Sequence, residues 1–83
     1  MTNEGKDRKP FHIIVNARPR EVSGESISYR DVVKMGFPNA DFVQFLFEVQ
    51  YTGPHTPDGT LVDGQSVALE NGLKFDVTKT NKS

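Results

Sequence analysis

Near its end the chain reads Glu70-Asn71-Gly72-Leu73-Lys74-Phe75-Asp76-Val77. Apolar and polar residues alternate along this stretch from Leu73, a pattern that predicts a strand with one buried face. The dipeptide before it, Asn71-Gly72, is typical of a tight turn into such a strand. The last residues that follow are polar. The sequence therefore predicts a small domain that closes its core with its last strand and continues into a short polar tail.

The clearest strand pattern lies upstream, from Phe42 to Tyr51. Its alternation predicts one covered face and one mostly polar face, as in an antiparallel or mixed sheet. The side chains expected to point inward are Val43, Phe45, Phe47, Val49 and Tyr51. Those expected to point outward are Phe42, Gln44, Leu46, Glu48 and Gln50.

A β-hairpin is predicted at the other end of the domain. Residues 11–16 are rich in β-branched and aromatic side chains and predict the first strand. Residues 17–20 then predict a turn, and residues 21–23 a short second strand that ends at Gly24. The chain thus begins its ordered part with two neighbouring strands.

A short helix is predicted between the hairpin and the long strand. Ser28 is a favourable N-cap residue, and Asp31 stands three residues later, where a negative charge favours the positive helix end. Apolar residues then recur at helical spacing over residues 29–35. Gly36 suits the left-handed position that closes a helix, and Pro38 prevents its continuation.

The order of these elements predicts an α+β fold of the β-grasp type. A single helix must cover the buried face of a single sheet, because no other element can do so. We expect a mixed four- to five-stranded sheet with one short helix packed across it, its first and last strands adjacent and the long strand beyond the last. A four-stranded antiparallel sheet in another strand order is the alternative. The expected organisation is a disordered leader (1–10), the domain (11–78) and a flexible tail (79–83).

Composition excludes several classes of protein. The chain has 83 residues, a formal net charge of −1 and no cysteine, so it contains neither disulfides nor thiolate metal sites. Its basic residues are dispersed, which argues against nucleic-acid binding. No apolar run approaches the roughly 20 residues that span a membrane. The leader lacks the apolar core of a secretion signal, and we expect a cytoplasmic protein.

No catalytic constellation is evident in the sequence. The carboxylates are scattered among predicted loops and strand exteriors, and the two histidines, His12 and His55, are far apart. Metal sites usually need three or four ligands, so we expect no metal and no cofactor. The glycines are isolated turn residues and form no phosphate-binding loop. The chain is predicted not to be an enzyme.

Four stretches resemble the bacterial multiubiquitin family of ubiquitin-like β-grasp domains. They are a strand ending in Val15-Asn16 with Ala17-Arg18 after it, the helix entry Ile27-Ser28-Tyr29, the turn Leu61-Val62-Asp63-Gly64, and the ending Asn71-Gly72-Leu73-Lys74-Phe75-Asp76-Val77-Thr78. Together the similar segments span nearly all of the chain from residue 11 onward.

The resemblance implies a ubiquitin-like protein modifier. Such proteins are encoded in bacterial operons beside an adenylating activating enzyme, a conjugating enzyme and a JAB-type metalloprotease, and related systems have been associated with antiviral defence. By this resemblance the C-terminal carboxylate is activated and joined to target proteins, by an isopeptide or ester bond. The conjugation tail would be formed by Thr80, Asn81, Lys82 and Ser83.

One feature departs from ubiquitin, which ends in Gly-Gly. Here the last residues are Asn81-Lys82-Ser83, so the residue that presents the reactive carboxylate stays open. Two alternative functions remain: a β-grasp interaction module that is never conjugated, and, with less support, a sulfur carrier.

The predicted sheet also suggests a partner-binding surface on its outer face. Ubiquitin uses an apolar patch on that face to meet its partners. By the same geometry Ile14, Phe42 and Leu46 would be exposed there, with Lys74 between them. We expect these residues to dock on the activating or conjugating enzyme.

Overall fold

The structure, a computed structural model, describes residues 9–82. The predicted leader therefore lies mostly outside the described residues, apart from the exposed Lys9 and Pro10. The chain contains one α-helix, α2 (Tyr29–Gly36), in the described range. The strands are β1 (Phe11–Val15), β2 (Arg18–Val22), β3 (Ser26–Ser28), β4 (Phe45–Thr52), β5 (Gly59–Leu61), β6 (Ser66–Ala68) and β7 (Lys74–Asn81).

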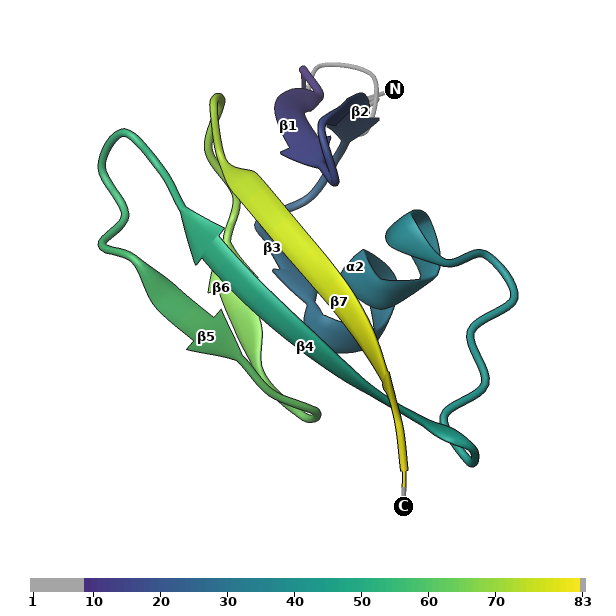
Figure 1. The fold of residues 1–83 in the computed structure, drawn as a ribbon. Helices are drawn as coiled ribbons and strands as arrows, with labels where there is room; N and C mark the ends of the chain where they lie inside the picture. Colours follow the sequence, from purple (N-terminus) through teal and green to yellow (C-terminus); the bar gives the residue numbers. More distant parts are fainter. Residues whose placement is uncertain (1–8, 83) are drawn as a thin grey trace.

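Five of these strands form one mixed sheet in the order β2-β1-β7-β4-β5 (Figure 1). The first and last strands, β1 and β7, are adjacent and parallel, and the long strand β4 pairs antiparallel with β7 on its other side. The helix crosses one face of this sheet. The predicted β-grasp arrangement is therefore confirmed, and the purely antiparallel alternative is wrong.

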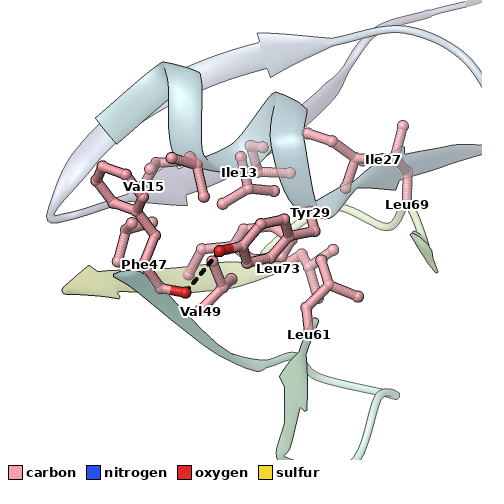
Figure 2. Packing of buried hydrophobic residues seen from close by; sticks show 13 residues of the cluster. Ile13, Val15, Ile27, Tyr29, Phe47, Val49, Leu61, Leu69 and Leu73 are labelled. Carbon is pink, nitrogen blue, oxygen red and sulfur yellow. Dashed lines mark hydrogen bonds between the residues drawn. The ribbon is translucent and has the colours of Figure 1, made fainter. Parts of the chain in front are cut away.

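The core lies between α2 and the inner face of the sheet (Figure 2). Alternate residues of the central strands point into it, because successive side chains of a strand face opposite sides. Among them Ile13, Val49 and Phe75 are almost completely buried. Tyr29 at the start of the helix is buried too, and its hydroxyl donates a hydrogen bond of 2.7 Å to the carbonyl of Phe47. Burial raises the pKa of this phenol above its ordinary value.

The predicted helix is confirmed, but its end differs from the expectation. Ser28 is the N-cap, and its hydroxyl accepts the backbone N–H of Asp31 at 3.2 Å. Gly36 does not adopt a left-handed conformation. A Cβ at this position would lie 3.1 Å from Asn16 Nδ2 and 3.4 Å from the side chain of Val77. Glycine thus allows the last turn of α2 to pack closely on β1 and β7.

The hairpin turn is tighter than predicted. It consists only of Asn16 and Ala17, which have φ angles of 51° and 69°, as in a two-residue turn of type I′. Arg18, Pro19 and Arg20 therefore belong to β2 and not to the turn. Pro19 has no N–H to donate, and it is tolerated because β2 is an edge strand.

A second, two-stranded sheet of β3 and β6 was not expected as an element of its own. It lies under the start of α2, where the Tyr29 N–H also donates to the Gln65 carbonyl at 3.0 Å. Each of its strands has three residues, which is too short for a periodic pattern to reveal. The pair buries Ile27 and completes one end of the core.

Candidate functional site

The chain does not leave the sheet where the sequence predicted. We expected a flexible tail from residue 79, but β7 continues to Asn81 and pairs with β4 to its first residue, Phe45. Thr80 lies opposite Leu46 in this pairing. Two of the predicted tail residues, Thr80 and Asn81, are thus part of a strand, Lys82 follows directly, and Ser83 lies outside the described residues.

Lysine contacts explain why the strand continues after its apolar pattern has ended. The Lys79 ammonium lies 4.4 Å from the centre of the Phe45 ring and 5.8 Å from that of Phe37, on the helix side of the sheet. Such cation–π contacts stabilise a charge on an aromatic face. Lys82 donates its backbone N–H to Gln44 O at 3.3 Å and its Nζ to Phe42 O at 3.1 Å. Polar residues therefore hold this end of β7 to the chain before β4.

Phe42 does not lie on the outer face, so this part of the predicted partner surface is wrong. It precedes β4 and packs against the core side, with its ring centre 5.3 Å from that of Phe47 and 6.3 Å from that of Tyr29. The guanidinium of Arg30 lies 4.5 Å from the centre of the Phe42 ring. The same guanidinium binds Asp63 through two hydrogen bonds of 3.1 Å, which lowers the pKa of that carboxyl.

Val43 also differs from the prediction, since it points outward. Asp41 starts a turn in which its Oδ1 accepts the N–H groups of Val43 at 2.9 Å and Gln44 at 3.1 Å. This turn breaks the alternation that we read across residues 42–51, and β4 begins only at Phe45. An aspartate ahead of a turn is a recognisable signal. The side chain of Val43 is left 82% exposed.

The remaining predicted partner residues do lie on the outer face, but the structure does not bring them together. Ile14 is half-buried beside Lys74, its partner in the parallel pairing of β1 with β7. Leu46 is 56% exposed beside Thr80. Lys74 and Thr80 are six residues apart on one strand, about 20 Å. Ile14 and Leu46 are therefore at opposite ends of β7 and cannot form one patch.

The surface between them is polar and slightly hollowed. A depression of about 370 Å³ is lined by side chains of β4, β7 and the loop before β5, with Gln50, Asp58, Lys74 and Asp76 among them. The Asp58 carboxylate accepts a hydrogen bond from the hydroxyl of Thr52. Such a hollow presents opposite charges to a partner but offers little apolar area.

The perturbed carboxylates hold loops in place and do not gather in a cleft. Glu70 accepts hydrogen bonds from the hydroxyl of Thr56 and from the backbone N–H of His55, and these bonds lower its pKa. Asp63 is bound to Arg30, as described above. Within residues 9–82, no three His, Asp or Glu side chains lie close enough to hold a metal ion.

The sequence profile of the multiubiquitin family matches residues 11–81. The chain belongs to the multiubiquitin family. The match extends from the first residue of β1 to the last of β7, so it includes the strand end that carries the predicted tail residues. This multiubiquitin domain has a ubiquitin-like fold. Searches of curated proteins and of solved structures gave no significant match.

Across residues 9–82 this multiubiquitin domain has no helix that is both long and apolar enough to cross a bilayer.

Proposed function

We propose that this multiubiquitin domain is a ubiquitin-like protein modifier in a bacterial ubiquitination-like pathway. One observation carries the proposal. The central strand β7 runs past the core to Asn81, so residues that follow it emerge at one end of the sheet beside the turn at residues 41–44 (Figure 1). A modifier needs its chain end presented in this way. The family match supports the same function.

The proposed chemistry belongs to the partners. An oxygen of the C-terminal carboxylate attacks the α-phosphorus of ATP on an adenylating enzyme, and pyrophosphate leaves. A nucleophilic side chain of the enzyme then attacks the acyl carbon, loses its proton to solvent and displaces AMP. The acyl group passes to a conjugating enzyme and then to an amine or hydroxyl of a target protein. Because the first step consumes ATP, we place the reaction in the cytoplasm.

The reverse step completes the proposed pathway. A JAB-type metalloprotease would add water across the new bond, which restores the carboxylate of the modifier and the amine or hydroxyl of the target. In this scheme the domain supplies a carboxylate and a recognition surface, and it has no catalytic role of its own.

A block at the carboxylate tests the proposal. The full chain is mixed with ATP and the adenylating enzyme of a multiubiquitin operon, and exchange of labelled pyrophosphate into ATP is measured. We expect exchange with the free carboxylate and none with a chain whose C-terminus is an amide. Equal exchange with both chains, or with neither, would overturn the proposal.

A non-conjugated interaction module is the second candidate, because the end of β7 is held in the sheet. Asn81 pairs with Phe45, and Lys82 binds both Gln44 and Phe42. Deletion of Thr80 to Ser83 would remove paired strand residues as well as the carboxylate, so it does not separate the two functions. The amide does, because it changes the carboxylate alone.

A further inference from the structure

The strand β7 is paired along its whole length on one side only. β4 accompanies it from end to end, whereas β1 pairs with it only at Lys74 and Phe75 (Figure 1). β1 ends at Val15, and the hairpin turn then carries the chain away into β2. Among the described residues, the part of β7 beyond Phe75 therefore has a strand on its β4 side and none on the other.

The pairing fixes the direction of the backbone groups in this part of β7. Lys82 donates its N–H to the carbonyl of Gln44, on the β4 side. Successive residues of a paired strand turn their N–H and C=O groups to opposite sides, so Thr80 also faces β4. Lys79 and Asn81 face away from it. No hydrogen bond within residues 9–82 uses the N–H or C=O of Lys79 or the N–H of Asn81.

Asn16 marks the point where the unpaired part begins. Its Oδ1 accepts the N–H of Val77 at 2.7 Å, just after β1 has ended. The carbonyl of Val77 has no partner within the described residues. We call this carbonyl, together with the N–H and C=O of Lys79 and the N–H of Asn81, the free edge. Unpaired groups of this kind are a template for one more strand.

The helix side of the free edge has an unpaired cation beside a depression. The Lys79 ammonium lies over the Phe45 ring and has no carboxylate partner within residues 9–82. A depression of about 260 Å³ next to it is lined by Phe37 and Pro38 among others. The Asp41 carboxylate, also in the lining, already accepts two backbone N–H groups. A glutamate matches this place, because its carboxylate can pair with the lysine while its methylene groups cover apolar surface.

The outer side of the free edge has the opposite charge. Asp76 of β7 and Glu48 of β4 are both exposed there. Thr78 and Thr80 of β7 point to the same side. Carboxylates would be repelled on this side, whereas threonine next to threonine is a favourable pair. Because an added strand alternates its side chains between the two sides, the matching segment alternates glutamate, toward Lys79, with threonine-like residues.

A second copy of this chain matches the free edge less well. A two-fold antiparallel pairing that is centred on the free edge would set Lys79 of one copy directly opposite Lys79 of the other. Both ammonium groups would then lie on the same side of the joined sheets, and like charges in such a pair are destabilising. A separate extended segment with carboxylates has no such conflict.

We propose that the free edge binds an extended segment of a partner protein, which joins the sheet as a strand in line with β1 and sets a glutamate beside Lys79. In recognition by strand addition, main-chain hydrogen bonds supply affinity and alternate side chains supply specificity. The site needs no activation of the C-terminal carboxylate. It therefore goes beyond the proposed function, and its test is independent of that function.

A peptide titration followed by NMR of the backbone amides tests the free edge. The probe is an end-blocked peptide of alternating threonine and glutamate, and the control probe has lysine in place of glutamate. We expect the glutamate probe alone to shift the amide signals of Lys79 and Asn81 and to slow their hydrogen exchange. The amide of Thr60 should not respond. It faces away from β4 on the other edge of the sheet, near Asp58, which repels glutamate.

Two pairs of variants test the contacts of the probe. Asn81→Pro removes a donor of the free edge without disturbing the pairing with β4, since this N–H points away from β4. It should raise the Kd of the glutamate probe by about fivefold, the worth of one hydrogen bond, whereas Asn81→Ala keeps the donor and the Kd. Lys79→Gln should weaken binding by at least about as much, whereas Lys74→Gln, on the outer side, should not. The Thr80 amide signal and thermal unfolding establish that β7 is intact in each variant.

Absence of shifts at Lys79 and Asn81 with millimolar glutamate probe, or equal binding of the two probes, would overturn the proposal. An unchanged Kd in either Asn81→Pro or Lys79→Gln would overturn it as well. If the same two amides instead shift with the concentration of the protein before any probe is added, the occupant is a second copy and the proposal is wrong.

Discussion

At the scale of single residues, Ala17 holds an unfavourable backbone conformation. Its φ of 69° lies in the left-handed region, where a Cβ approaches the following carbonyl at a cost of about 1–2 kcal/mol. Asn16 tolerates the same region better, and its Oδ1 also accepts the N–H of Val77 at 2.7 Å. The hairpin thus combines one residue that suits the turn with one that does not.

We therefore expect Ala17→Gly to stabilise the domain by about 1 kcal/mol, because glycine adopts this conformation without the Cβ penalty. The free energy of unfolding is measured in urea. Ala68→Gly is the control, since Ala68 lies in β6 and has no positive φ. It should destabilise by about 0.5–1 kcal/mol. A loss of stability in both variants would contradict a left-handed Ala17.

Some predictions for single residues are wrong. The sequence predicts a continuous alternation through Phe42 and Val43, yet the turn begun by Asp41 reverses both side chains. It also predicts a left-handed Gly36, yet this glycine allows close packing on Val77. The two errors have different causes. The turn at Asp41 is a local signal that the alternating pattern conceals. The close neighbours of Gly36 are distant in sequence, so no local pattern indicates them.

At the scale of elements, Glu70 ties the loop between β4 and β5 to the turn before β7. Its carboxylate binds Thr56 and His55, and its side chain is only one-fifth exposed. These bonds favour the charged form and lower the pKa of Glu70 below its ordinary value of 4.5. The carboxylate therefore stabilises the fold above the unfolded-state pKa, and this contribution is lost as the pH falls through the lowered folded-state pKa.

We expect Glu70→Gln to be less stable than the unaltered chain at pH 7, with a difference that shrinks progressively as the pH falls below about 4.5. Urea unfolding midpoints of the two chains at a series of pH values give this difference directly. Asp63 also has a lowered pKa, but it is present in both chains and its effect cancels. A difference that stays constant with pH would show that the charge of Glu70 is irrelevant.

Long elements could be predicted from the sequence, whereas the shortest ones could not. The helix, the long strand and the closing strand have periodic patterns, and all three were located to within a few residues. The three-residue strands β3 and β6 have none. The end of β7 was missed for another reason. After Val77 the side chains are polar, and the strand continues through backbone pairing with β4 and through Lys79 on aromatic rings.

At the scale of the whole molecule, β4 and β7 form one ribbon whose two ends have different support. Over the core, Val49 pairs with Val77 and both are buried. At the other end Phe45 pairs with Asn81, which is exposed, and there Phe45 is only half-buried. Local opening follows such differences in burial. This difference in support bears on the proposed activation. The enzyme needs access to the chain end, and local opening would provide it without unfolding the domain.

We expect amide hydrogen exchange to reveal this division. Lys82 donates its N–H toward β4, so the alternation of antiparallel pairing points the amides of Thr80, Thr78 and Asp76 the same way. After correction for intrinsic rates, Thr80 and Lys82 should exchange at least about tenfold faster than Asp76 and Thr78. Phe45→Ala should accelerate exchange at Thr80 and Lys82 far more than at the other two amides.

Val49→Ala is the matched control, because it removes methyl groups from the core and lowers the stability of the whole domain. It should accelerate exchange at Asp76 and Thr78, which open only when the domain unfolds. If Phe45→Ala instead accelerated all four amides equally, the end of the ribbon would open only together with the core. An enzyme would then have to unfold the domain to reach its chain end, and activation would be limited by the global stability of the fold.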